Sequence, residues 1–205
     1  MLPVTGGTAL AAGGTFVKLA VPIPNPFGPP DSVGDDSFQS PNLFAFDENQ
    51  NILLGTALRV DVGSTIAAGT IVASHYVFFD PGPLQNIVGT VTFDSHVLAI
   101  ITSTGNLLAS DVLQNTGVNY LNPDARGLEA GDSVTISGFD TIVFDTSAST
   151  PGDYVRVLTE FSPGATGPSP VPEPASVALL AGGLAVLLPR KGLRMVWSRV
   201  TGKTA

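Results

Sequence analysis

The two histidines, His75 and His96, are the first candidates for acid–base chemistry in this chain of 205 residues. His75 lies in the apolar run TIVASHYVFFD, and His96 follows Asp94 and Ser95 at an expected turn. A serine, a histidine and an aspartate can form a hydrolytic triad. However, the chain has no Gly-x-Ser-x-Gly elbow, and Asp-Ser-His is a common triplet. We therefore expect core or surface roles for both histidines and no enzymatic activity, with a secreted hydrolase as the least favoured alternative.

Carboxylates near the first strong strand are the candidates for metal binding. Calcium takes several oxygen ligands, which loops often supply. The candidate ligands, with Glu48 beside the last of them, are Asp31, Asp35, Asp36 and Asp47. Their spacing matches neither an EF-hand loop nor a Gly/Asp nonapeptide repeat, and the histidines lack the close spacing of helical zinc motifs. We favour a solvated acidic loop and no cofactor. A calcium-dependent carbohydrate- or matrix-binding module is the alternative.

Composition excludes several other classes of site. The chain has no cysteine, so it has no disulfide, thiolate metal ligand or cysteine nucleophile of its own. Its glycines form neither a Walker A motif nor a Rossmann fingerprint. Residues 1–170 carry four Lys and Arg side chains against sixteen carboxylates. Nucleic-acid binding requires a basic footprint, so we expect no nucleic-acid partner.

The elements that must position these residues have strand character. Between residues 42 and 162, short runs rich in β-branched and aromatic residues alternate with turns containing Gly, Pro, Asp or Asn. In residues 71–79, alternation places Val72, Ser74, Tyr76 and Phe78 on one face, with His75 on the other. Only residues 106–113 suggest a short helix. The body is predicted to be all-β, an antiparallel β-sandwich of Ig-like or jelly-roll type, with a barrel as the alternative.

The sequence also suggests boundaries around this body. Residues 1–41 hold an N-terminal strand and a Pro/Gly-rich loop region, which is either separate from the sandwich or part of it. The sandwich covers residues 42–162, and a Pro/Gly/Ser linker follows at 163–170. A hydrophobic segment occupies residues 171–194, and residues 195–205 form a basic tail.

The segment after the linker is predicted to contain a single C-terminal helix. Prolines keep the lead-in extended, whereas Pro174 suits the first position of a helix. A helix over residues 175–188 would be about 21 Å long, which is short against a bilayer core of about 30 Å. The cations that follow it can stop transfer and snorkel to the cytoplasmic interface. These membrane-stop residues are Arg190, Lys191 and Arg194.

This combination resembles the PEP-CTERM sorting domain of Gram-negative bacterial exoproteins, over roughly residues 170–194. The residues that match the recognition stretch are Val171, Pro172, Glu173, Pro174, Ala175 and Ser176. The resemblance implies a transient stay in the inner membrane and cleavage near residues 172–174 by an exosortase, a membrane protease. It also implies a host that makes extracellular polysaccharide or biofilm matrix. We therefore expect a non-enzymatic protein of the cell surface or extracellular matrix, with polysaccharide as a candidate partner.

Overall fold

The computed structural model describes residues 3–10 and 13–165. The chain divides into two compact units, Met1–Gly167 and Pro168–Ala205, and all described residues belong to the first. The expected C-terminal helix and the sorting-signal residues lie outside the described residues. Within the described part, no helix is long and apolar enough to cross a membrane.

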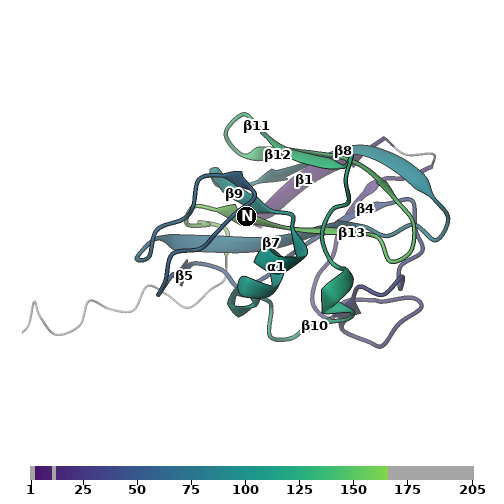
Figure 1. Cartoon of the computed structure of the whole chain (residues 1–205), viewed down its shortest axis with the longest axis horizontal. Coiled ribbons are helices and arrows are strands. Elements are labelled where there is room, and N and C mark those ends of the chain that lie inside the picture. Colours follow the sequence, from purple (N-terminus) through teal and green to yellow (C-terminus); the bar gives the residue numbers. More distant parts are fainter. Residues whose placement is uncertain (1–2, 11–12, 166–205) are drawn as a thin grey trace, which may run out of the picture. The chain divides into compact units, whose positions relative to one another are not determined.

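Strands dominate the first unit, which confirms the all-β prediction (Figure 1). The strands are β1 (Val4–Ala9), β2 (Phe16–Lys18), β3 (Ser32–Val33), β4 (Leu43–Asp47), β5 (Ile52–Leu53), β6 (Val62–Gly63), β7 (Ile71–Phe79), β8 (Gln85–Phe93), β9 (Val97–Ile101), β10 (Asn119–Tyr120), β11 (Ser133–Ser137), β12 (Thr141–Ala148) and β13 (Asp153–Thr159). The helices are α1 (Thr104–Ala109) and the 3-10 turns η1 (Asp111–Leu113) and η2 (Pro123–Ala125). The short helix predicted over residues 106–113 thus corresponds to α1 and η1.

Two main sheets organise these strands. The first sheet has the order β1-β8-β12-β11, and all of its pairs are antiparallel. The second has the order β2-β4-β7-β13-β9-β6, with β5 paired to β7. Its pairs are antiparallel except for β2 with β4. The remaining strands, β3 and β10, form a small parallel pair.

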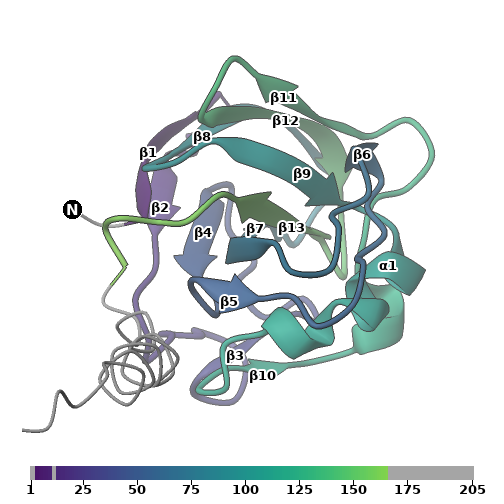
Figure 2. The same ribbon diagram turned by 90° about the vertical axis from the view of Figure 1, so that its left-hand side faces the viewer.

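The two sheets face each other across one hydrophobic core (Figure 2). Val91 and Phe144 project into this inter-sheet core from the first sheet, and Val77 and Val157 from the second. On β7, Val77 and Phe79 belong to this core, whereas Val72, Tyr76 and Phe78 belong to a second core on the opposite face. The alternation predicted for residues 71–79 is therefore confirmed, and both of its faces are buried.

A layer of loops and short helices covers the outer face of the second sheet (Figure 2). The Pro/Gly-rich loop contributes Ile23 and Phe38 to the outer core, and α1 and η1 contribute Leu107 and Leu113. Phe38 packs between Phe44 and Phe78, with ring centroids 4.8 and 4.9 Å away. The Pro/Gly-rich loop region therefore contributes apolar side chains to the outer core of the body.

Candidate functional site

Three polar clusters lie in or beside the two cores, and the first is a row across β4, β7 and β13. Asp47 and His75 are cross-strand partners. His75 Nδ1 is 3.0 Å from Asp47 Oδ1, and Nε2 is 3.1 Å from Thr159 Oγ1. The row continues to Lys18, whose Nζ is 2.7 Å from Asp47 Oδ2. Its Asp–His–hydroxyl order is that of a hydrolytic triad.

The access and hydrogen bonding of this row favour a structural role over a catalytic one. Both His75 and Thr159 are fully buried, so a substrate has no route to the hydroxyl. The Thr159 hydroxyl also donates a hydrogen bond to the carbonyl of Glu160, at 3.1 Å. Lys18 and Asp47 instead border an open depression of about 740 Å³, which Phe46 and Asn115 also line. The row therefore satisfies polar groups at the end of the inter-sheet core.

The second cluster is a buried ion pair in the outer core. Arg156 Nε donates to Glu48 Oε2 at 2.6 Å, and Arg156 Nη2 donates to Glu48 Oε1 at 2.9 Å. Ser74 and Tyr120 donate further hydrogen bonds to the Glu48 carboxylate, at 2.6 and 2.7 Å. The guanidinium also donates to Ser110 and to the carbonyl of Leu107. Because this arrangement satisfies both charges, it holds the covering layer on the sheet.

The carboxylates proposed from sequence as calcium ligands have separate surroundings. Asp31 Oδ1 accepts a hydrogen bond from the backbone N–H of Ile23, at 2.9 Å. Asp35 is exposed, and Asp36 is partly buried near Asp80, whose pKa is raised mainly by burial and to a smaller extent by the charge of Asp36. Asp47 is paired with Lys18 and His75. Among the described residues, the group of three acidic side chains close enough to share a cation includes none of these four.

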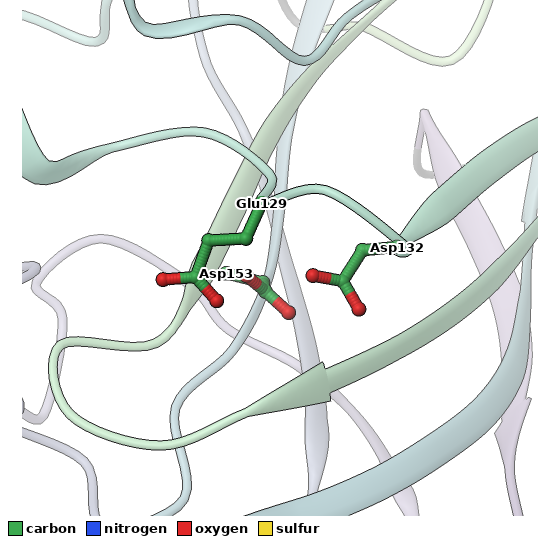
Figure 3. Close-up of side chains that lie close together, drawn as sticks. All are labelled: Glu129, Asp132 and Asp153. Carbon is green, nitrogen blue, oxygen red and sulfur yellow. The ribbon is translucent and has the colours of Figure 1, made fainter.

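That group, the third cluster, consists of Glu129, Asp132 and Asp153, and we call it the acidic trio. One potential ligand oxygen from each side chain lies within 4.8 Å of the other two. Glu129 and Asp132 come from the loop between η2 and β11, whereas Asp153 begins β13. Figure 3 shows the three carboxylates turned toward one another, with Asp153 between the two loop residues. The trio thus brings side chains from the loop before β11, in the first sheet, close to a side chain of β13, in the second sheet.

Local backbone features place the members of the trio. Gly152, directly before Asp153, has φ +90° and lies so close to β7 that a Cβ would be 2.8 Å from the carbonyl oxygen of Phe79. Glycine meets both demands without strain. On the loop side, Asp132 Oδ1 accepts a hydrogen bond from the backbone N–H of Ser147, at 2.8 Å, which fixes the side chain against β12.

The three carboxyl groups of the trio lie close together, and no positively charged side chain in the described part of the chain pairs with them. Burial, together with the charges of Asp132 and Glu129, raises the pKa of Asp153 to about 7 against the opposing effect of the Thr146 hydroxyl. Glu129 is exposed, Asp132 is partly buried and Asp153 is buried, so the cluster is open to solvent on one side.

His96 occupies the surface position that the sequence suggested for one of the histidines. Its ring stacks on Phe139 with centroids 4.6 Å apart, and its Nδ1 is 3.3 Å from Glu160 Oε1. The carboxylate that its ring contacts is therefore that of Glu160, and no hydrogen bond to Asp94 of the Asp-Ser-His triplet is found in the described part of the chain. Asp94 Oδ2 instead accepts hydrogen bonds from Ser162 and Gly164.

Sequence reasoning did not identify the acidic trio. Glu129 and Asp132 stand in an EAGD turn, and Asp153 follows the Pro-Gly turn before the last strand. Either motif alone reads as an ordinary polar turn. The β11–β12 pairing could have placed Asp132 near Ser147, because Ser133 pairs with Asp145. The position of Asp153 depends on how the two sheets pack, and no local pattern encodes that.

Comparison of the chain with protein-family models, curated proteins and solved structures finds no match in any of the three. The function is therefore argued from the residues themselves.

Proposed function

We propose that this chain is an exported, non-enzymatic protein of the cell surface or extracellular matrix, sorted through its C-terminal segment. The observation that carries the proposal is the sequence VPEPAS at residues 171–176, followed by a charge-free run and then by Arg190, Lys191 and Arg194. This order is similar to that of the PEP-CTERM sorting domain. In sequence, the segment follows the β-rich body and lies within Pro168–Ala205.

In this proposal the apolar run holds the precursor in the inner membrane with its basic end in the cytoplasm. An exosortase then cuts near residues 172–174 on the outer side. Proline on both sides of Glu173 keeps the backbone extended, which suits a peptidase that grips an extended chain. Cleavage would remove five of the nine cations and release an acidic body toward the polysaccharide matrix.

Features of the β-rich body favour a role as exported, non-enzymatic cargo over a catalytic role. We propose a β-sandwich of Ig-like or jelly-roll type, because one core lies between two mainly antiparallel sheets. Its triad-like row is fully buried at both His75 and Thr159. Four cations against sixteen carboxylates before residue 171 also oppose nucleic-acid binding.

Intact-mass analysis of the protein exported by an exosortase-bearing Gram-negative host tests the sorting proposal. We expect a mature C-terminus near residues 172–174 and accumulation of the uncut Glu173→Ala variant in the membrane fraction. The matched control is Asp124→Ala, which removes an exposed carboxylate of the body and should leave release unchanged. Full-length protein in the secreted material, or normal release of Glu173→Ala, would overturn the proposal.

A further inference from the structure

Two polar side chains stand where the inter-sheet core would be expected to continue. Alternate residues of a strand share a face. Asp153 therefore shares the inward face of β13 with Val155, and Thr146 shares the inward face of β12 with Phe144. Val155 and Phe144 both belong to the inter-sheet core. Asp153 and Thr146 thus extend the facing surfaces of the two sheets at the end where Glu129 and Asp132 lie.

The Thr146 hydroxyl lies close enough to Asp153 to oppose the rise in its pKa, but neither side chain makes a hydrogen bond of normal geometry within the described part of the chain. Asp153 is 2% exposed and Thr146 is 4% exposed. Among the described residues, Asp153 Oδ2 and Thr146 Oγ1 are buried oxygens that have no hydrogen-bond partner. Folded proteins rarely leave such groups unpaired, and an ordered water or an ion usually satisfies the exceptions. Two unpaired oxygens beside two further carboxylates favour a cation over a neutral partner at this position.

We propose that Glu129, Asp132 and Asp153 bind a calcium ion, with the Thr146 hydroxyl as an additional oxygen ligand. Three carboxylates whose oxygens lie within 4.8 Å of one another offer a cation several oxygens at once. No Lys or Arg in the described part of the chain forms an ion pair with them. Calcium suits the set better than magnesium, because it accepts six to eight oxygens in flexible geometry, whereas magnesium requires a near-ideal octahedron and retains its waters.

The bound ion would act as a clamp between the sheets. Asp132 is held against β12 in the first sheet by its hydrogen bond from Ser147, and Asp153 begins β13 in the second sheet. A cation shared by both side chains ties the loop before β11 to β13. Because this geometry exists only in the folded chain, calcium stabilises the fold by mass action.

The position of Glu129 at the rim gives the ion access from solvent, and water completes the coordination shell. A partly exposed site with three carboxylates is comparable to the calcium sites of extracellular modules, for which Kd is about 10⁻⁴ to 10⁻³ M. The inference rests on residues of the body alone and is independent of the proposed sorting. Failure of either proposal leaves the other intact.

Calorimetric titration of the full-length, chelator-treated chain with CaCl₂ tests the site. We expect binding of one ion, at least tenfold weaker binding in Glu129→Gln, and loss of measurable binding in Asp153→Asn. Asp145→Asn removes a carboxylate that neighbours Thr146 in sequence but lies on the opposite, exposed face of β12, so it cannot ligate the ion and should change Kd by less than about twofold. The melting temperature should rise with calcium in the parent and in Asp145→Asn, but not in Asp153→Asn.

Absence of binding up to about 10 mM calcium, beyond the range of extracellular modules, would overturn the proposal. Equal weakening by Asp145→Asn and Glu129→Gln would overturn it as well, because the effect would then be general electrostatic attraction. Magnesium binding as tight as calcium binding would overturn the choice of calcium. If Asp153→Asn does not fold, the exposed Glu129→Gln decides the test, since its side chain supports no packing in the core.

Discussion

Arg156 and Glu48 are both fully or nearly fully buried, and each depends on the other to remain so. The guanidinium makes two hydrogen bonds to the carboxylate, and Ser74 and Tyr120 satisfy the remaining acceptor positions. Asp111 lies 3.5 Å from Arg156 and also pairs with Arg126, so the polar network extends into η1 and η2. Ionic groups thus connect the second sheet to its covering layer.

Removal of one member of this buried pair should destabilise the body strongly. Arg156→Met leaves the Glu48 charge buried without its main partner, and we expect a loss of about 3–5 kcal/mol in the free energy of unfolding. Denaturant titration measures this change in the free energy of unfolding. The double variant Glu48→Met, Arg156→Met should lose much less than the sum of the single variants, because no charge remains buried. Arg59→Met, at an exposed position, is the control. Additive losses would contradict this account.

Asp80 gives the stability of the body a specific dependence on pH. Burial, with a smaller contribution from the charge of Asp36, raises the pKa of Asp80 to about 6 against the opposing backbone N–H of Phe38. In the unfolded chain an aspartate has a pKa of about 3.9. The folded state therefore binds more protons between these values, and its free energy of unfolding should decrease as pH rises from about 4 to about 6.

Asp80→Asn isolates this contribution. The amide oxygen can still accept the 3.0 Å hydrogen bond from Phe38, but it does not ionise. The variant should resemble the parent at pH 4 and exceed it in stability at pH 7, in thermal melts recorded with a chelator present. Asp124→Asn should reproduce the parent at both pH values. An Asp80→Asn variant that tracks the parent across this range would contradict the assignment.

At the scale of elements, the second sheet is unusual in being buried on both faces. Strand β13 is buried along its whole length, and β7 along all but its first residue. Antiparallel sheets often leave one face to solvent. Here the loop region before β4 and the segment from α1 to η2 cover that face. The covering layer contains little regular structure, but its apolar side chains complete the outer core.

A pair of phenylalanines in the same loop tests whether this layer is integral. Phe38→Ala should lower the free energy of unfolding by about 3–5 kcal/mol, because Phe38 is 4% exposed and its removal leaves a cavity against Phe44 and Phe78. Phe27 is 67% exposed, so Phe27→Ala should cost less than about 0.5 kcal/mol. Denaturant titrations of both variants give the comparison. Similar small losses would mean that the loop is a detachable segment.

At the scale of the whole molecule, charge is divided between the two units of the chain. Of the four Lys and Arg side chains before residue 171, Lys18, Arg126 and Arg156 are engaged in ion pairs, and Arg59 is exposed. The surface of the body is therefore strongly anionic. This character fits both proposals, since an acidic body remains soluble after release and meets divalent cations outside the cell.

The melting temperature of the body before and after cleavage provides a second test of the sorting proposal. The described strands all precede residue 160, well before the proposed cleavage position. The released body should therefore melt at the same temperature as the body within the full-length chain at matched calcium. A large drop after cleavage would show that the C-terminal unit supports the fold, contrary to the removable role proposed for it.

The sequence alone determined the all-β character of the body and the two faces of β7. In β7, successive side chains point to opposite faces, so the assignment of Tyr76 and Phe78 to one face and of His75 to the other follows from local geometry. Composition likewise excluded cysteine chemistry. The VPEPAS stretch with its apolar run is equally local, and the sorting prediction made from it stays a prediction.

Only the tertiary structure decided which polar groups meet. Asp153 lies more than twenty residues from Glu129 in sequence, and the two come together because the sheets stack and Gly152 brings the chain close to β7. The burial of Glu48 and Arg156 depends in the same way on a covering layer folded from distant loops. Periodicity assigns a side chain to a face, but sheet packing and loop closure determine what that face meets, and these are long-range properties.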